Sequence, residues 1–587
     1  MNPDIVFVSG LGLLETDKMM PQFGQIILQR ILAPHYTVKL VNFEELVAMK
    51  TWHYEPSYDD TIERMAEYLL SFGARLIGFY TICDNFINVA KLSERIHALS
   101  PSTLITFGGP HATLTWEACL KTFPFVSAIS VGESEYSIIP LMNTLLEGGS
   151  LAEVPGIAYR DGEGRPVRNL PCDLVPAEDL YQYAVFDMEG MIKPGVAPMY
   201  IEGGRGCPFQ CSFCATSVFW KRRFRVKPVE DLIREMDMHH DRSGFRRFSI
   251  QHDIFTANRK HLKSFCQTLI DRGSPYGWSC SSRIDVLDEE VIRLMAQSGC
   301  ETVFLGIETG SPRMQKLINK NLNLNDAVRK IMLMEQVGID VEASFIYGLV
   351  DETEVDFFMT LEMLRQFFLA GVTNTQLHRY FVLPATKDEE RIRDQLYFDE
   401  NEIDMSIAGR KSLTPENRAR ILAHPELFTH FFTFKNPVRQ KYRWADSLSF
   451  FTNNLSIDHP KTARMLMRRM DYLQLYQKYE DKFRQLSVCF SMEGFLPLKR
   501  LVEKFGREVI EAENVPEMTE MYRYEEDVKQ FLQSGQKDMR LVTYQMDIYT
   551  AIREERYVMK PFRAALSLDP ASARVKLTPL PDWLHLE

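Results

Sequence analysis

Short apolar runs alternate with amphipathic helical patterns over residues 1–150. The runs have the length of strands, and each helical pattern between them can return the chain to the same edge of a sheet. This alternation predicts an α/β domain with a doubly wound, flavodoxin-like parallel sheet covered by helices on both faces. The predicted strands are Ile5 to Val8, Val38 to Val41, Leu76 to Tyr80, Leu104 to Phe107 and Val126 to Val131, with helices at 22–32, 61–72, 86–99 and 135–147.

Three of these predicted strands end in loops of small or polar residues. The loops are Ser9 to Gly12, Thr81 to Asn85 and Gly108 to His111. A doubly wound sheet binds its ligands at the carboxyl ends of the strands. The candidate ligand-binding residues of the three loops are Ser9, Gly10, Thr81, Cys83, Asp84, Gly108, Gly109, Pro110 and His111.

The alternation fades between Leu151 and Pro198, where prolines and the turn Asp161 to Gly164 predict a small hairpin followed by an extended linker. A second alternating series then predicts six βα units. Such a series can close into a partial, TIM-like (β/α)6 barrel with its chemistry at the carboxyl ends of the strands. Its predicted strands are Met199 to Ile201, Arg247 to Gln251, Tyr276 to Ser281, Thr302 to Ile307, Val341 to Tyr347 and Thr375 to Phe381.

Strand patterns stop beyond about residue 395. Long, charged and periodically apolar segments at Thr462 to Gln485 and Tyr524 to Glu554 predict helices instead. We therefore expect four regions: a Rossmann-like domain at 1–150, the hairpin and linker at 151–198, the barrel at 199–392 and a helical carboxyl-terminal domain at 393–587.

The composition is that of an ordinary globular protein, with 45% hydrophobic and 25% charged residues among 587. The net charge is −11 and no basic run stands out, which argues against nucleic acid as the main partner. No apolar stretch approaches the roughly 20 residues of a membrane span, and the first residues lack the cationic start of a targeting signal. We expect a cytoplasmic protein.

Three of the ten cysteines lie close together: Cys207, Cys211 and Cys214, on a glycine-rich loop directly after a predicted strand. In a long cytosolic chain a tight group of cysteines indicates metal binding more than disulfides. Three such thiolates can surround one soft metal centre. Structural zinc is the alternative, but it takes four protein ligands and no fourth Cys or His lies nearby in the sequence. On a four-iron cluster, three cysteines would leave one iron open.

The CxxxCxxC spacing, with the aromatic Phe213 before the last cysteine, resembles the radical S-adenosylmethionine (SAM) superfamily over about residues 199–390. The resemblance implies a 4Fe-4S cluster on the three cysteines, with SAM chelated to the open iron and contacted by Phe213. It implies that the reduced cluster splits SAM into methionine and a 5′-deoxyadenosyl radical, which takes a hydrogen atom from the substrate. The implied partner is a reducing electron donor of the flavodoxin or ferredoxin type.

Two further segments resemble this family. Glu308, within Gly306 to Ser311, matches the fourth-strand motif whose polar groups approach SAM; a helix cap or a surface carboxylate is the alternative. Ser344 and Gly348 belong to a segment similar to the fifth-strand motif near adenine. The sequence departs from the family where Val350-Asp351 stands for Pro-Gly and Pro384-Ala385-Thr386 for Pro-Gly-Thr, which concerns the local loop geometry.

Asp253 and Arg283 follow the second and third predicted strands of the barrel. If the family pattern holds, the Asp253 side chain projects into the barrel mouth, and Asp253 and Arg283 are our candidate catalytic residues. A buried ion pair is the alternative explanation for them.

The amino-terminal domain resembles the cobalamin-binding module that precedes many radical SAM cores. Gly108 to Thr113 carries the resemblance, together with Val131 to Glu135, which adds Gly132 and Glu133 as cofactor contacts. Glycine lets the backbone approach a bulky ligand, although a plain strand-to-helix turn also explains Gly108 to Pro110. Proteins that bind cobalt through histidine carry Asp-x-His-x-x-Gly, whereas Ile82 to Phe86 has no histidine. We expect the lower face of the cobalt to lack a protein histidine.

Family members with this layout most often methylate an unactivated carbon, using methylcobalamin and two SAM molecules per turnover. The resemblance therefore implies a C-methyltransferase acting on a small molecule or a peptide. Radical cyclisation, rearrangement or oxidation without methyl transfer is the first alternative, and a cobalamin- or metal-binding sensor is the second. Substrate contacts lie on loops that no motif identifies. Only Cys489 lies beyond residue 300, so we expect no second cluster in the carboxyl-terminal region.

Overall fold

A computed structural model describes most of the chain and divides it into two compact units. The first unit is Met1–Asp340, Ile346–Phe357 and Arg379–Lys441, and the second is Val341–Phe345, Phe358–His378 and Tyr442–Glu587. Part of the predicted linker (185–193 and 196) and the side chain of Cys489 lie outside the described residues. The described residues are 2–13, 22–184, 194–195, 197–372, 374–403, 412–492, 495–534, 540–554, 557, 559–568 and 575–579.

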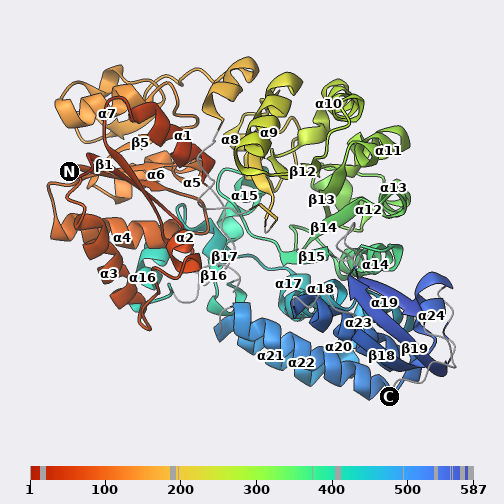
Figure 1. The fold of residues 1–587 in the computed structure, drawn as a ribbon. Helices are drawn as coiled ribbons and strands as arrows, with labels where there is room; N and C mark the ends of the chain where they lie inside the picture. Colours follow the sequence, from red (N-terminus) through yellow and green to blue (C-terminus); the bar gives the residue numbers. More distant parts are fainter. Residues whose placement is uncertain are drawn as a thin grey trace. The chain divides into compact units, whose positions relative to one another are not determined.

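The amino-terminal sheet has seven strands in the order β2-β1-β3-β4-β5-β6-β7. Figure 1 labels two of them, β1 and β5. Its first five strands are parallel in the order 2-1-3-4-5, which is the flavodoxin-like order, so this prediction is confirmed. The strands are β1 (Ile5–Ser9), β2 (Val38–Asn42), β3 (Leu76–Tyr80), β4 (Leu104–Gly108), β5 (Val126–Ser130), β6 (Ile157–Arg160) and β7 (Pro166–Arg168).

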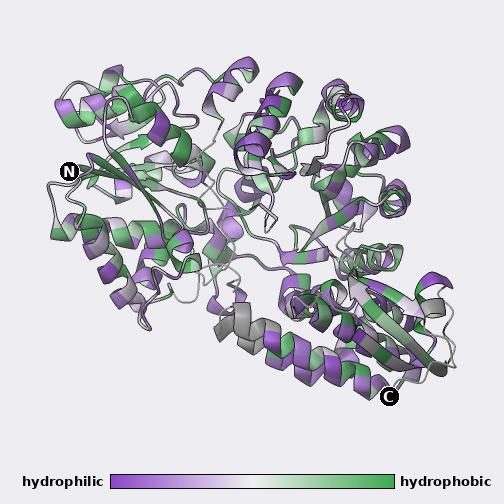
Figure 2. Cartoon of the chain, in the orientation of Figure 1, coloured by the Kyte–Doolittle hydropathy of each residue, from purple (hydrophilic) through white to green (hydrophobic). Residues whose placement is uncertain are grey.

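The inner strands of this sheet are buried on both faces, which explains why β1 and β3 to β5 are mostly apolar. Ile5 and Phe7 belong to one hydrophobic cluster, while Val6 and Val8 belong to the other. The strands accordingly carry the hydrophobic colour in Figure 2. The covering helices are α1 (Phe23–Leu32), α2 (Phe43–Ala48), α3 (Tyr58–Leu70), α4 (Phe86–Leu99), α5 (Pro110–Leu114), α6 (Trp116–Thr122) and α7 (Ile138–Glu147).

The predicted hairpin is also present, and it extends the sheet. β6 pairs antiparallel with β5, and β7 pairs antiparallel with β6. The turn between them is closed by Asp161, whose carboxylate accepts from the backbone amides of Glu163 and Arg165 at 2.9 Å each.

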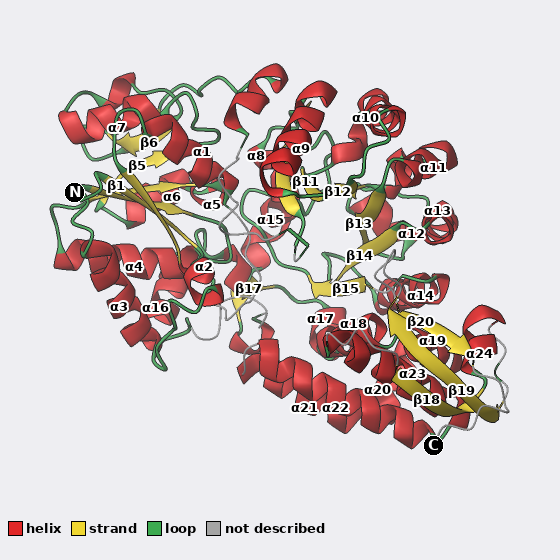
Figure 3. Cartoon of the chain, in the orientation of Figure 1, coloured by secondary structure: helices red, strands yellow, loops and turns green. Residues whose placement is uncertain are grey.

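A second sheet has six strands in the order β15-β14-β13-β12-β11-β8, as predicted for a partial barrel. The register is parallel for β8, β11, β12 and β13. The strands are β8 (Met199–Glu202), β11 (Arg247–Gln251), β12 (Gly277–Ser282), β13 (Cys300–Glu308), β14 (Asp340–Tyr347) and β15 (Asn374–Arg379). Helices fill the gaps (Figure 3): α8 (Ala215–Phe219), α9 (Val229–Ser243), α10 (Arg259–Asp271), α11 (Glu289–Gln297), α12 (Pro312–Leu317), α13 (Leu324–Val337), α14 (Glu354–Ala370) and α15 (Lys387–Ile392).

The segment after the barrel returns to the amino-terminal domain. Phe428 packs against Phe86 with ring centroids 5.6 Å apart, and Asn417 donates to the Tyr58 hydroxyl at 3.0 Å. Residues 379–441 therefore group with the first unit. The elements of this segment are β16 (Tyr397–Phe398), α16 (Pro415–Ala423), β17 (Phe432–Thr433) and α17 (Pro437–Lys441).

The second unit is mainly helical, with one expectation overturned. Its predicted helix over Tyr524 to Glu554 is wrong at Arg540–Met546, which form a strand of a three-stranded antiparallel sheet between two helices, α23 and α24. None of the described helices is long and apolar enough to cross a membrane. The elements are α18 (Ala445–Asp458), α19 (Pro460–Arg469), α20 (Tyr472–Lys478), α21 (Glu480–Met492), α22 (Phe495–Glu513), α23 (Pro516–Gln533), β18 (Arg540–Met546), α24 (Ile548–Glu554), β19 (Met559–Leu568) and β20 (Val575–Pro579).

Candidate active site: one cavity with two walls

A cavity of about 760 Å³ lies within the first unit, and two sets of residues line it. One wall comes from the amino-terminal sheet with helices α1 and α7. The other comes from the barrel strands and the loop that follows β8. All three predicted cluster cysteines lie on the barrel wall. The two folds therefore present their strand ends to the same space, where both are expected to bind ligands.

The loop that carries the cysteines is held through its backbone before Cys207 and again between Cys211 and Cys214. The amide of Gly206 donates to Oδ2 of Asp253 at 3.1 Å, and the Gly206 carbonyl lies 3.1 Å from Nε2 of His252. Further along, the amide of Ser212 donates to the Ile318 carbonyl at 3.0 Å. The loop thus holds its shape through the barrel residues around it.

The three thiols are free and half-buried. Burial raises the pKa of Cys207 to about 11. Burial also raises the pKa of Cys211, but the charges of Lys320 and Arg283 oppose that rise. No three Cys, His, Asp or Glu side chains in the described part of the chain gather around a single metal ion. A four-iron cluster makes a different demand, because each thiolate binds a different iron.

Two buried cations flank Cys211. Arg283 places Nη1 3.6 Å from the Cys211 sulfur, and its guanidinium lies 3.9 Å from the ring centre of Phe209. Lys320 donates to Oε1 of Glu308 at 2.6 Å, with side chains only 6% and 10% exposed. Glu308 is therefore neither a surface carboxylate nor a helix cap. A Cβ on Gly306 would lie 2.3 Å from that carboxylate, so only glycine leaves room for the pair.

Glu308 also has a strained backbone, with φ at +69°. A non-glycine residue in this region costs on the order of 1–3 kcal/mol, and such strain clusters at functional sites. The side chain lines the cavity beside the cysteines. The fourth-strand motif thus places a strained, buried carboxylate on the lining of the cavity, next to the three cysteines.

Asp253, Arg283 and Phe213 line the barrel wall as well. Asp253 supports the cysteine loop, as described above, and burial raises the pKa of its carboxyl group. Arg283 donates from Nε to Oδ1 of Asp285 at 3.0 Å. An ion pair, which was the alternative explanation for this residue, is therefore present. Phe213 packs against a hydrophobic cluster that includes Met314 and Leu349.

On the opposite wall the predicted glycines approach the cavity. Gly108, Gly109, Pro110, Gly132 and Glu133 all line it. Gly109 has φ +97°, and a Cβ there would lie 2.6 Å from the Thr81 carbonyl. Thr81 supports this turn from behind, since its hydroxyl donates to the Gly108 carbonyl at 2.8 Å and accepts from the Ala112 amide at 2.9 Å.

Several predicted contacts lie elsewhere. Ser9, Gly10, Thr81, Cys83, Asp84, His111, Ser344 and Gly348 are not among the described residues that line this cavity. His111 is buried against Phe86, 4.1 Å between ring centres, and burial lowers its pKa to about 3. Cys83 places its sulfur 3.0 Å from Nδ1 of His430. These two side chains belong to the packing behind the loops.

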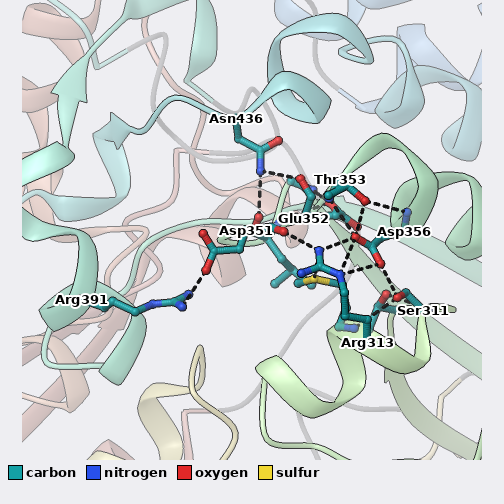
Figure 4. A network of polar contacts seen from close by, with 12 residues as sticks. Ser311, Arg313, Asp351, Glu352, Thr353, Asp356, Arg391 and Asn436 are labelled. Carbon is teal, nitrogen blue, oxygen red and sulfur yellow. Dashed lines mark hydrogen bonds and ion pairs between the residues drawn. The ribbon is translucent and has the colours of Figure 1, made fainter.

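The β14 loop is braced by polar contacts outside the cavity (Figure 4). Asp356 accepts from the Thr353 amide at 2.9 Å and also binds Arg313 and Ser311. Glu352 accepts from the amides of Gly348 and Leu349, and burial raises its pKa to about 8. Asn436 donates to the Leu349 carbonyl at 3.0 Å. Gly348 is therefore part of a fixed loop, and a Cβ there would lie 2.5 Å from Arg439.

Sequence reasoning missed two kinds of site residue. Lys320 lies on a loop without any motif, and only its burial beside Cys211 distinguishes it. The apolar end of the cavity was also missed: Phe7, Gln25, Leu28 and Gly78 line it between α1 and the sheet. Gly78 is the one signal of that end in the sequence, since an interior strand glycine often marks the close approach of a ligand or another chain segment.

Known proteins agree with this arrangement. Residues 201–364 match the family model of the radical SAM superfamily. An uncharacterized methyltransferase of Pyrococcus horikoshii is 27% identical over 315 residues, which are 52% of this chain and 68% of that protein. An anaerobic magnesium-protoporphyrin IX monomethyl ester cyclase of Rubrivivax gelatinosus is 29% identical over 320 residues, 52% of this chain. The chain spans 56% of the length of that cyclase.

Two solved structures share the fold. The radical SAM methyltransferase TsrM from Kitasatospora setae, with tryptophan and a SAM analog bound, aligns with a TM-score of 0.56 at 17% identity, over 78% of this chain and 90% of that one. The cobalamin-dependent radical enzyme OxsB, with aqua-cobalamin and SAM bound, gives 0.56 at 14% identity, over 91% and 80%. The cysteine motif at the end of β8 lies within this family match, so residues 201–364 of the chain resemble the radical SAM superfamily.

Proposed function

We propose that this protein is a cobalamin-dependent radical SAM enzyme that transfers a methyl group to an unactivated carbon. The observation that carries the proposal is the single cavity with its two walls, one bearing three cysteines and the other bearing glycine turns. A cluster, SAM and a corrinoid would then share one space with the substrate. The methyltransferase relatives support this choice of reaction.

The barrel wall fits a cluster and SAM by the chemistry of its side chains. Cys207, Cys211 and Cys214 would hold three irons. Arg283 and Lys320 are cations beside Cys211, and Glu308 is an anion next to them. A zwitterionic amino-acid group such as that of SAM needs both charges for its carboxylate and its ammonium.

The sheet wall fits a corrinoid by shape. Gly108, Gly109 and Gly132 present backbone without side chains, and the apolar end between α1 and the sheet continues the cavity past Phe7 and Gly78. Such a space suits a flat, bulky ligand with a long tail. No histidine of the Ile82 to Phe86 loop is available, and His111 is packed behind the wall.

When bound, the reduced cluster supplies the electron that splits SAM, and a methylcorrinoid supplies a methyl group. The residues of the chain bind and orient. Asp253 and His252 hold the cysteine loop through Gly206, and Arg283 covers Phe209 on that loop. The aromatic side chains of Phe219, Trp220 and Phe304 line the same wall and would exclude water from the substrate.

Radical cyclisation is the second candidate, because the cyclase relative matches about as well as the methyltransferases. In either case the enzyme needs a one-electron donor of the flavodoxin or ferredoxin type and a substrate that is a small molecule or a peptide. A sensor, by contrast, would bind ligands without turnover.

Turnover with SAM that carries a deuterated methyl group separates these reactions. For methylation we expect the product of the true substrate to be heavier by the labelled methyl, with both 5′-deoxyadenosine and S-adenosylhomocysteine formed. The control is the C207A/C211A/C214A variant, which should lack iron and form no 5′-deoxyadenosine while still binding hydroxocobalamin. An unlabelled product with 5′-deoxyadenosine would favour cyclisation. If the reconstituted wild-type protein does not cleave SAM, the proposal that it is a radical SAM enzyme is wrong.

A further inference from the structure

The cysteine loop begins and ends on a two-stranded ribbon. β9 (Gly204–Arg205) enters the loop and β10 (Arg225–Val226) leaves it, pairing antiparallel so that Arg205 lies opposite Arg225. Like charges directly opposite one another destabilise a strand pair. The base of the loop therefore needs anions to hold it closed.

Those anions come from the loop after β5, on the other wall of the cavity. Nη1 of Arg205 lies 2.6 Å from Glu135 and 3.3 Å from Glu133. Arg225 donates to Oε2 of Glu133 at 3.0 Å. These four side chains are only 5–12% exposed. Since water screens buried charges poorly, the contacts fix the two loops against each other far more firmly than surface ion pairs would.

The charge on Glu133 is secured by its partners. Burial raises the pKa of Glu133, but the hydrogen bond from Arg225 and the charge of Arg205 outweigh burial and leave that pKa below its usual value. Glu202 completes the group by accepting from Nε of Arg205 at 2.7 Å. Two arginines thus face three carboxylates, and each arginine has a carboxylate from the opposite wall.

The ribbon has little freedom to absorb movement. A Cβ on Gly204 would lie 2.3 Å from the Arg225 carbonyl, and one on Gly206 would lie 1.9 Å from the Arg223 carbonyl. The two sides of the ribbon are therefore packed too closely at these glycines to admit a side chain. A shift of Glu133 and Glu135 would move the ribbon as a unit, together with Cys207 two residues beyond Arg205.

We propose that Arg205 and Arg225 are positioning residues that clamp the cysteine loop to the loop of Gly132 to Glu135, so that the two walls of the cavity keep a fixed spacing. The contacts of the clamp do not depend on the proposed function. Only the identity of the ligands, a corrinoid on one wall and a cluster on the other, rests on it. It makes the corrinoid and cluster sites energetically coupled, because a ligand that orders one loop orders the other.

Hydrogen–deuterium exchange of the ligand-free chain tests the clamp directly. In E133Q/E135Q, which leaves the cysteine loop itself unchanged, we expect peptides within 206–224 to exchange at least tenfold faster than in wild type. The matched control is E235Q, which breaks another buried pair, Lys227 with Glu235 at 2.6 Å, in the barrel but outside the lining of the cavity. It should leave 206–224 unaffected. If the double variant does not fold, E135Q alone should give a smaller increase of the same kind.

Adding hydroxocobalamin shows whether these ion pairs only stabilise the fold or also couple the two ligand sites. In wild type the corrinoid should slow exchange of 206–224 at least threefold, and in E133Q/E135Q it should protect its own wall but not that loop. The clamp would be overturned if peptides of 206–224 exchanged at the same rate in wild type, E133Q/E135Q and E135Q. It would also be overturned if the corrinoid still protected these peptides in E133Q/E135Q. If wild type binds no corrinoid, the proposed function fails, while the ligand-free comparison still decides the clamp.

Discussion

The two walls of the cavity are built on opposite principles. The barrel wall presents side chains: three thiols, Arg283, and the buried pair of Lys320 with Glu308. The sheet wall presents mainly bare backbone and apolar side chains, with Gly108, Gly109 and Gly132 at its turns. Its two carboxylates, Glu133 and Glu135, are paired with Arg205 of the barrel side. The first wall therefore depends on charges that compensate one another, and the second depends on space. Substitutions should fail differently on each: by unpaired charge on the barrel wall and by added volume on the sheet wall.

The largest effect is expected on the barrel wall, at Lys320 and Glu308. Removing one member of a buried ion pair leaves the other charge uncompensated, which typically costs about 3–5 kcal/mol. We expect K320M and E308Q each to lower the free energy of unfolding by that amount in urea titrations. The double variant E308Q/K320M should recover most of the loss, because neither charge of the pair remains to be left unpaired.

The same double variant sharpens the comparison by separating stability from binding. If the pair also receives the charged groups of SAM, E308Q/K320M should be nearly as stable as wild type yet bind SAM at least tenfold more weakly. Its matched control is the pair of Lys227 with Glu235, equally buried but outside the lining of the cavity. Weakened SAM binding in E235Q as well would show that the effect is not specific to the wall.

On the sheet wall, neighbouring glycines give a smaller and more selective effect. At Gly109 the positive φ and the Thr81 carbonyl 2.6 Å from an added Cβ both oppose alanine, so G109A should destabilise the fold by about 1–3 kcal/mol. At Gly108 the nearest atom to an added Cβ is 3.7 Å away, an ordinary contact. G108A should therefore change stability by less than about 0.5 kcal/mol.

Although G108A should hardly change stability, we expect it to weaken corrinoid binding. Its added methyl lies on the lining of the cavity, so we expect G108A to bind hydroxocobalamin about tenfold more weakly, equivalent to about 1.4 kcal/mol. Unchanged corrinoid affinity in G108A, measured by equilibrium dialysis, would mean that this turn does not contact the ligand.

Regular alternation made the two parallel sheets predictable, because a strand buried on both faces has to be apolar whatever it packs against. Leu76 to Tyr80 is an example, with predicted and observed bounds the same. The strand Arg540–Met546 was missed, since its antiparallel partner lies in a later segment and its own composition allows a helix. Pairing of that kind is not encoded in a local period.

The candidate site divides in the same way. The cysteine spacing identified the cluster loop because ligands of one centre come from one short segment. Lys320, Arg205 and Glu135 have no such signature, since their partners come from other elements. Conversely, Cys83 and His111 were chosen for loop position alone; His111 is buried against Phe86, and the half-buried Cys83 contacts His430. A residue's place at a strand end does not determine which way its side chain points.

That core behind the sheet wall gives the last and smallest effect, a dependence of stability on pH. Burial lowers the pKa of His111 from 6.5 to about 3, and it lowers that of His430 to about 3 as well, with help from the charge of His111. Both histidines are neutral in the folded protein, whereas in the unfolded chain they take up protons as the pH falls below 6.5. Their contribution to stability is therefore complete above pH 6.5 and is lost between pH 6.5 and about 3.

Each histidine should cost on the order of 1 kcal/mol at pH 5.5. Other groups titrate in the same range, so the test is a difference between variants. In urea titrations, H111F and H430F should each flatten the fall in stability between pH 6.5 and 5 relative to wild type, while H35Q, which removes an exposed histidine, should not. Slopes equal to wild type in both phenylalanine variants would mean that protons reach these histidines in the folded state. The wall would then be open from behind, and the contrast between a charged wall and a closed apolar one would no longer hold.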